Sequence, residues 1–308
     1  MQSEDIVSEV FSTLRLKAHL YFEAKLATDF SIEIPKERRL IRFHMVLEGA
    51  CWVVVPDFDP VCLTAGDVVL IPDGSAQILA SDPTLKPSPL PKLLTPRNLE
   101  KGVFRYDVED EAPANRLLCG YCQFDEALDH PVLKTLPPLV LLKLSQTEQD
   151  PVLDAFLKPI RKLADQPVQG RDALLTRLIE GLFIQTVMGQ YDNTGSGSFV
   201  ASLQDWRIAK ALTCIHQNPE TAWTIDSLAK EAGMSRARFA DLFNRLVGIP
   251  PIQYLSLHRL SQGRVLLKDT NLGLDEIASR CGYASASSFS RRFKEEFGLG
   301  PGAYRRAG

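Results

Sequence analysis

The pattern of apolar and polar positions divides the chain into a strand-like part followed by a helical part. Apolar runs at residues 40–47, 51–55 and 68–71 each end at a glycine or proline turn, and a later run covers residues 117–124. Short strands separated by such turns are typical of a small barrel or sandwich. We therefore predict a β-fold for this part of the chain.

From about Glu148 the apolar period becomes helical. Residues 152–160 form one apolar stripe and residues 174–184 form a broader one. Two helices with wide apolar faces fit plain packing on a core, and they also fit a dimer interface. Both interpretations stay open, and the second leads us to expect that this part of the chain dimerises.

Two polar stretches punctuate the chain. Residues 192–198 read Asp-Asn-Thr-Gly-Ser-Gly-Ser, which is typical of a flexible linker. We therefore predict a domain over residues 1–191, a linker over 192–199 and a second domain over 200–308. Five prolines fall between residues 82 and 98, where we predict an exposed loop.

One pattern occurs twice in the last third of the chain. The copies begin at Ser227 and Glu276, with an offset of 49 residues before an internal turn and 50 after it. The matching positions are Gly233 with Gly282, Ser235 with Ser285, Phe239 with Phe289, and Phe243 with Phe293. Each glycine can end a helix in the left-handed conformation, and we expect Ser235 and Ser285 to cap the helix that follows.

Helix, tight turn and helix is the helix-turn-helix layout, whose second helix enters the DNA major groove. Residues 252–268 predict one helix of roughly 25 Å between the copies. A rod of that length can hold two recognition helices on one face of DNA, about one duplex turn apart.

These residues resemble known families. Residues 200–308 resemble the DNA-binding domain of the AraC/XylS family, most closely from Gly282 to Arg305. Residues from about 40 to 190 resemble the cupin-type sensor domain of one branch of that family, on His44 with residues 47–49, on residues 65–72 and on residues 136–138. The resemblance implies an α+β chain: a cupin-like β-barrel with a helical dimerisation segment, then an all-α domain with two helix-turn-helix motifs joined by a linker helix.

The resemblance also implies a function. It implies a transcription activator that binds double-stranded promoter DNA as a homodimer, responds to a small-molecule effector bound to residues 1–191, and contacts RNA polymerase. We also expect no enzymatic activity and no required cofactor.

Helix geometry selects the side chains that face DNA, because the phenylalanines of each copy must point inward. The expected DNA-binding residues are Arg236, Ala237, Ala240, Asp241 and Asn244 in the first copy, and Ser285, Ser287, Arg291 and Lys294 in the second. By resemblance, the base-contacting positions of the family fall on Ala237, Ala240, Asp241, Ser287 and Arg291.

Arg291 is the strongest candidate base reader, because a guanidinium group can grip guanine O6 and N7. A phosphate contact or an ion pair with Glu295 is the alternative. The first copy offers mainly alanines, which can contact thymine methyl groups.

The charge of the chain is uneven. Residues 1–199 carry a net charge of −8 and residues 200–308 one of +5, so only the second part favours a polyanion. There is no apolar run of about 18 residues, and residues 1–5 are polar and acidic apart from Met1. We therefore expect a cytoplasmic protein with no membrane contact, and six cysteines that are mostly buried thiols.

Two groups in the first half could carry chemistry. Cupin enzymes hold a metal with several histidines and a glutamate, but His44 is nearly alone and Gln77 stands where a further histidine is expected. We therefore expect no metal site. Cys119 and Cys122 form a CxxC pair, which can indicate redox chemistry. Residues three apart on a strand point to opposite faces, so buried structural thiols are the stronger interpretation.

A possible effector motif lies at the start of the first strong strand. Arg38 and Arg42 form Arg-x-x-x-Arg, and Asp73 and Ser75 supply Asp-x-Ser. Together they resemble the PilZ motif for cyclic di-GMP, whose guanines and phosphates two arginines can grip. Cyclic di-GMP is thus one candidate effector, and a generic apolar or carboxylate molecule is the other. Against an effector-controlled regulator stand a thiol-based redox sensor and a cupin-type enzyme with an accessory DNA module.

Overall fold

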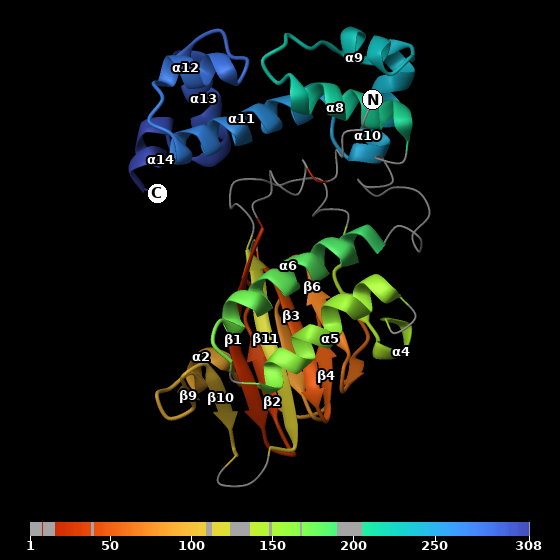
Figure 1. Ribbon diagram of the computed structural model, residues 1–308, viewed down its shortest axis with the longest axis vertical. Helices are drawn as coiled ribbons and strands as arrows, with labels where there is room; N and C mark the ends of the chain where they lie inside the picture. The colour runs from red at the N-terminus through yellow and green to blue at the C-terminus, as the bar shows by residue number, and fades with distance from the viewer. Residues whose placement is uncertain are drawn as a thin grey trace. The chain divides into compact units, whose positions relative to one another are not determined.

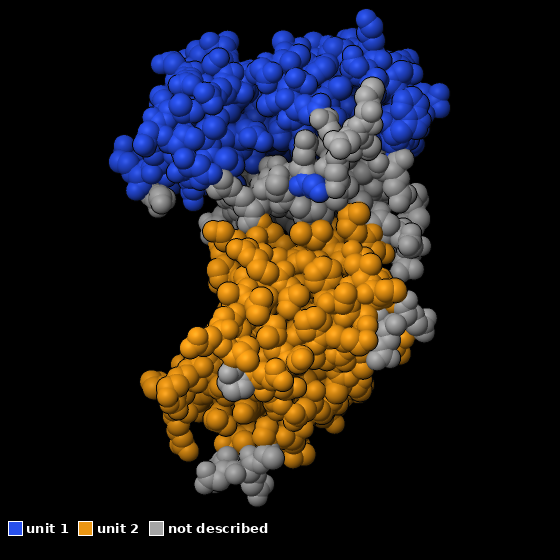
Figure 2. Space-filling view, viewed as in Figure 1, with its two compact units in different colours: residues 1–15, 125–135, 190–308 blue, residues 16–124, 136–189 orange. Residues whose placement is uncertain are grey.

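The computed structural model describes residues 8, 16–37, 40–108, 113–123, 136–147, 150–166, 168–189 and 205–307. The chain divides into two compact units (Figure 2). One contains residues 16–124 and 136–189, and we call it the β unit. Residues 205–307 belong to the other, which we call the helical unit. The linker predicted at 192–199 lies outside the described residues.

Two sheets form the frame of the β unit (Figure 1). The larger sheet has the order β12-β6-β3-β11-β1-β10-β9, and the smaller has the order β5-β4-β7-β2-β8. The strands of the larger sheet are β1 (Lys17–Leu26), β3 (Leu40–Glu48), β6 (Val68–Ile71), β9 (Leu99–Glu100), β10 (Val103–Tyr106), β11 (Asn115–Gln123) and β12 (Val140–Leu142). Those of the smaller sheet are β2 (Ser31–Ile34), β4 (Ala50–Val54), β5 (Val61–Thr64), β7 (Gln77–Ala80) and β8 (Ser88–Pro89).

The four strands predicted from the sequence are all present, with ends shifted by two residues or fewer. The segment with five prolines is more than an exposed loop, which corrects our prediction. It contains β8 and the short helix α2 (Leu90–Leu93), and β9 follows it directly. Side chains of α2 pack against the core between the sheets, because Leu90 and Leu93 are partly buried there.

Helices cover the outer face of the larger sheet. The helices of this unit after β12 are α4 (Leu144–Thr147), α5 (Pro151–Asp165) and α6 (Arg171–Gly189). Asp150 caps α5 by accepting from the backbone of Val152 and Leu153. α6 packs on both α5 and β1 (Figure 1). The two apolar stripes therefore do serve core packing, although Val152 and Leu174 remain about half exposed.

The helical unit contains the repeat found in the sequence. Its helices are α8 (Trp206–Gln217), α9 (Ile225–Glu231), α10 (Arg236–Val247), α11 (Pro251–Asp269), α12 (Leu274–Arg280), α13 (Ala286–Phe297) and α14 (Pro301–Ala307). α9 with α10 forms the first helix-turn-helix, α12 with α13 forms the second, and α11 joins them (Figure 1). The linker helix predicted over 252–268 is confirmed to within one residue at each end.

The turns follow the predicted chemistry at three of four positions. Gly233 and Gly282 have φ of 65° and 71°, the left-handed region that glycine tolerates. The Ser285 hydroxyl accepts from the backbone of Ser288 and caps α13. Ser235 occupies the N-cap position of α10 as predicted, but its side chain makes no capping hydrogen bond.

Candidate functional site

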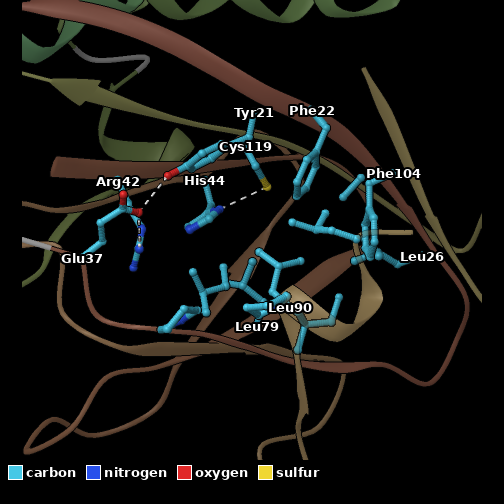
Figure 3. Close-up of a pocket in the computed structure, with 16 residues that line it drawn as sticks. Tyr21, Phe22, Leu26, Glu37, Arg42, His44, Leu79, Leu90, Phe104 and Cys119 are labelled. Carbon is cyan, nitrogen blue, oxygen red and sulfur yellow. Dashed lines mark hydrogen bonds and ion pairs between the residues drawn. The ribbon is translucent and has the colours of Figure 1, made fainter. Parts of the chain in front are cut away.

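A cavity lies between the two sheets of the β unit. Its volume is about 220 Å³, which exceeds what one or two water molecules need, since a buried water takes about 10–15 Å³. Most of the lining is apolar, from Phe22, Leu26, Leu79 and Phe104 among others. Figure 3 shows that Tyr21, Glu37 and Arg42 lie toward one end, whereas Leu26 and Phe104 lie toward the other.

Strand geometry explains which side chains reach the cavity. Arg42 and His44 are two residues apart on β3, so they share one face of the sheet. Tyr21 and Phe22 are adjacent on β1, yet both line the cavity. The pairing of β1 with β11 shifts register between Leu20 and Phe22, and such a bulge re-aims a side chain. The bulge therefore adds a phenol to an otherwise apolar wall.

The polar end of the cavity is built around Arg42. This side chain is 1% exposed. It donates to Glu37 Oε2 at 3.2 Å and to the carbonyl oxygens of Gly74 and Ser75, each at 3.4 Å. The Tyr21 hydroxyl lies 3.5 Å from the same Glu37 oxygen. Burial and the charge of Glu37 raise the pKa of Tyr21, so its hydroxyl is a donor at neutral pH.

His44 is held on both ring nitrogens. The Gln77 amide donates to His44 Nε2 at 2.6 Å, and His44 Nδ1 lies 3.1 Å from Cys119 Sγ, which is directly across the strand pair. Burial lowers the pKa of His44 to about 3, with the charge of Arg42 adding to the effect. The ring is therefore neutral, and it shapes the cavity wall rather than carrying charge.

The residues of this site do not fit a metal. In the part of the chain that the structure describes, no group of three or more histidine, cysteine or acidic side chains could hold one. Among the residues described, only Cys119 and Gln77 lie beside the ring nitrogens of His44, whereas a cupin-type centre needs several histidines and a carboxylate.

The CxxC pair is split between two environments. Cys119 lines the cavity, whereas Cys122 feels the charge of Glu180 on α6, at the helical face of the sheet. Both thiols are free and buried. Burial raises the pKa of Cys119, and it raises that of Cys122 to about 12. Thiolate reactivity at neutral pH is therefore suppressed at both positions.

The residues proposed for a guanine dinucleotide are only partly brought together. β3 and β6 are neighbours, which places Asp73 and Ser75 near Arg42 as predicted. However, Ser75 donates its hydroxyl to Asp73 at 2.6 Å, and Arg42 meets only the backbone carbonyl of Ser75. Arg38 lies outside the described residues.

The recognition helices present the predicted faces. In α10, Phe239 and Phe243 are fully buried, whereas Arg236, Ala237, Asp241 and Asn244 are exposed and Ala240 is half-buried. Arg236 forms an ion pair with Asp226 at 2.8 Å. Asp241 lies 3.8 Å from Arg245, so part of its charge is already compensated.

The second recognition helix, α13, offers freer side chains. Ser285, Ser287, Arg291 and Lys294 are all exposed. Glu295, the alternative partner considered for Arg291, pairs instead with Arg292 at 2.8 Å. Within residues 205–307 we find no hydrogen bond or ion pair of the Arg291 side chain, which leaves its guanidinium available.

Both units match known protein families. Residues 5–192 match the family described as Cupin, and residues 228–307 match the family described as Helix-turn-helix domain. The transcriptional regulator AlkR of Acinetobacter baylyi is 29% identical over 98% of this chain and 99% of its own. An AraC-like transcription regulator of Streptomyces lividans is 27% identical over 98% of both chains.

The chain belongs to the AraC-like transcription regulators that carry an N-terminal cupin domain. AraC-like regulators bind DNA, and this one combines the helix-turn-helix unit with an N-terminal ligand-binding domain. Neither matched family is a PilZ domain, so the cyclic di-GMP hypothesis gains no support from them. No described helix of this AraC-like chain is both long and apolar enough to cross a membrane.

Two solved structures are similar to about a third of this AraC-like chain. The DNA-binding domain of AdpA, solved with a target DNA, is 33% identical over 32% of this chain and 89% of its own, with a TM-score of 0.31. An AraC-type regulator from Chromobacterium violaceum is 27% identical over 33% of this chain and 92% of its own, with a TM-score of 0.32.

Proposed function

We propose that this regulator binds its effector in the cavity between the two sheets, and that the occupied cavity changes how the two helix-turn-helix motifs engage promoter DNA. The observation that carries the proposal is the cavity itself. It is apolar over most of its surface, has a buried cation at one end, and lies in the unit that does not carry the DNA-binding helices. Concave, mostly apolar sites with a few polar groups are typical of ligand pockets.

The cavity wall is fastened to the helices that cover the sheet. Arg116 on β11 bonds to Glu23 on β1, Glu48 on β3 and Asp165 on α5. Arg171, at the start of α6, lies 3.6 Å from Glu23. A ligand that shifts β3 or β11 would therefore also shift α5 and α6, which gives the effector a mechanical output.

The same helices are our proposed dimer contact. Val152 on α5 and Leu174 on α6 are 48% and 53% exposed, so each leaves an apolar side chain that a second copy of the chain could cover. A homodimer would double the number of recognition helices on DNA, and the linker at 192–199 would pass on a change in dimer geometry.

Sedimentation of the full chain tests the dimer. The wild type should sediment as a dimer at tens of micromolar, and Leu174→Glu combined with Val152→Glu should give monomers because charges cannot be buried there without a partner. Gln253→Glu, an exposed change on α11, should leave the dimer intact. A wild-type monomer at that concentration contradicts the proposal.

On the DNA side, we propose that Arg291 reads a base. Ser285, Ser287 and Lys294 would position α13 on the backbone, whereas Arg236, Ala237, Ala240, Asp241 and Asn244 would line the groove at α10. The exposure of these side chains, of which only Ala240 is half-buried, supports this assignment. We further propose that the regulator is a cytoplasmic activator that contacts RNA polymerase and has no enzymatic activity.

A thermal-shift screen tests the cavity as the effector site. The full chain is heated with a library of small apolar and amphipathic molecules, and a ligand of the cavity should raise the melting temperature of the wild type. Ala24→Leu fills the cavity, since Ala24 lines it, whereas Ala27→Leu adds the same bulk at a residue outside the lining. Hits that stabilise the wild type and the Ala27→Leu variant, but not the Ala24→Leu variant, support the proposal. Hits that stabilise all three equally would place the effector elsewhere.

A further inference from the structure

The wall of the cavity contains a buried guanidinium group, that of Arg42, whose hydrogen bonding is incomplete. Arg42 is 1% exposed, and its Nε atom has no hydrogen-bond partner among the described residues. Its two carbonyl contacts, to Gly74 and Ser75, are long at 3.4 Å. A buried guanidinium group normally needs an anion and a full set of acceptors to offset its lost hydration.

The anion that Arg42 does have is held loosely. Glu37 is its ion-pair partner at 3.2 Å, and the Glu37 side chain is 58% exposed. Glu37 stands on the segment that leads into β3, where its backbone nitrogen donates to the Gly74 carbonyl at 3.0 Å. Its carboxylate can therefore turn into water while its backbone stays in place.

Arg116 shows what a purely structural arginine looks like in the same sheet. It contacts three carboxylates, Glu23, Glu48 and Asp165. All of its partners belong to the fixed strands and helices of the unit, and it does not line the cavity. Arg42 differs because it faces the cavity, has a single carboxylate partner and keeps an unused donor.

We propose that the effector is a monocarboxylic acid with an apolar body, and that its carboxylate replaces Glu37 on Arg42. This inference rests on the proposed effector cavity and names the chemistry of its ligand. The ligand carboxylate accepts from the Arg42 guanidinium group and from the Tyr21 hydroxyl, which already face one oxygen of Glu37. The apolar body extends between the sheets toward Phe104 and Leu26 (Figure 3).

Glu37 is then an internal competitor for Arg42, and its carboxylate sets the effector concentration at which the cavity becomes occupied. In the free protein its carboxylate holds Arg42, and in the bound protein it is released to solvent. A neutral apolar molecule of the same shape fills the same volume, but it leaves the unused Arg42 donor unpaired. The site should therefore prefer acids over alcohols of equal length.

Calorimetry of the full chain tests this with straight-chain acids and alcohols of six to twelve carbons, using octanoate and 1-octanol as the matched pair. We expect one acid of the series to bind at least about tenfold more tightly than its alcohol, the size of one charge-assisted hydrogen bond. Glu37→Gln removes the competitor and should tighten the binding of that acid several-fold. Glu33→Gln, an exposed carboxylate on β2 outside the lining, should change nothing.

Arg42→Gln supplies the opposite arm. This variant should bind the acid at least about tenfold more weakly than the wild type does. It should bind the alcohol as tightly as the wild type, which a general loss of folding could not produce. Equal binding of acid and alcohol in the wild type, or an unchanged acid affinity in the Glu37→Gln variant, overturns the inference but leaves an apolar effector in the cavity. Absence of binding by every acid and alcohol also overturns it. The proposed cavity function itself fails only if the screen with Ala24→Leu places the effector elsewhere.

Discussion

Three arginines of this chain differ in what their guanidinium groups contact. Arg116 is surrounded by three carboxylates and fastens strands to a helix. Arg42 is buried beside a cavity with one exposed carboxylate partner. Arg291 is exposed on a recognition helix, where its neighbour Arg292 takes the nearby glutamate. We interpret Arg116, with three carboxylate partners, as structural. We propose that Arg42 and Arg291, which have fewer such partners among the described residues, bind a ligand and DNA.

The exposed guanidinium group of Arg291 leads to a prediction on DNA. Arg291→Ala should cost roughly 1–3 kcal/mol on the specific site and relax the preference at one base position, because a bidentate guanine contact is lost. Arg292→Ala, one residue along the helix and already paired, is the matched control. Fluorescence anisotropy at fixed salt on the selected site and on random DNA measures both. An equal loss on the two DNAs would make Arg291 a phosphate contact.

The buried histidines lead to a prediction on pH. Burial lowers the pKa of His44 to about 3 and that of His258 to about 4, whereas an unfolded histidine titrates near 6.5. Between these values only the unfolded chain binds the proton, so stability is full above pH 6.5 and falls as the pH falls toward 3–4. His44 alone should remove up to about 2 kcal/mol between pH 7 and pH 5.

Urea unfolding at the two pH values checks this. His44→Gln should reduce the loss of stability of the β unit between pH 7 and pH 5, because the variant has no group there to protonate. His19→Gln changes an exposed histidine of the same unit and should leave the loss as it is in the wild type. The same loss in His44→Gln as in the wild type would mean that His44 is not the group responsible.

At the scale of elements, the two helix-turn-helix motifs differ at their matched glycines. Gly233 and Gly282 share the left-handed conformation. A Cβ atom at Gly233 would meet nothing within 4 Å, whereas one at Gly282 would lie 2.6 Å from Arg259 and 2.7 Å from the Pro219 carbonyl oxygen. Arg259 on α11 also donates to that carbonyl at 2.6 Å, so Gly282 packs closely against a bonded pair of groups, whereas Gly233 does not.

Alanine at each glycine should therefore have unequal effects. Gly233→Ala should cost about 1–2 kcal/mol, the price of the left-handed conformation. Gly282→Ala should cost clearly more, since a backbone oxygen cannot yield and the Arg259 contact is disrupted. Urea unfolding of the two variants measures the difference. Equal destabilisation would show that the conformation alone governs both turns.

Elements with a repeating pattern were predictable from the sequence, and the cavity was not. α11 and β6 follow from their apolar periods, and the helix-turn-helix pair follows from two copies that agree. β1 was missed because its charged residues and the bulge at Tyr21 break the strand alternation. Tyr21 and Glu37 enter the site through that bulge and through the packing of two sheets, which no local pattern records.

At the scale of the whole molecule, the basic part of the chain suits DNA binding and the acidic part contains the cavity. Residues 200–308 carry the excess of positive charge and the two recognition helices, so they suit a polyanion. The β unit carries the cavity, and ion pairs fasten its walls to α5 and α6. Regulation by the effector requires a coupling free energy between the cavity and DNA, because without it the effector would bind and change nothing.

Affinity for DNA with and without the effector tests that coupling most directly. A binding site is first selected from random DNA, and its affinity for the full chain is measured with and without a hit of the thermal screen at saturation. We expect the molecule to change the affinity of the wild type by about 5–150-fold, the usual range of allosteric coupling, and to leave the Ala24→Leu variant unchanged. An equal affinity of the wild type for DNA in both conditions would contradict the account.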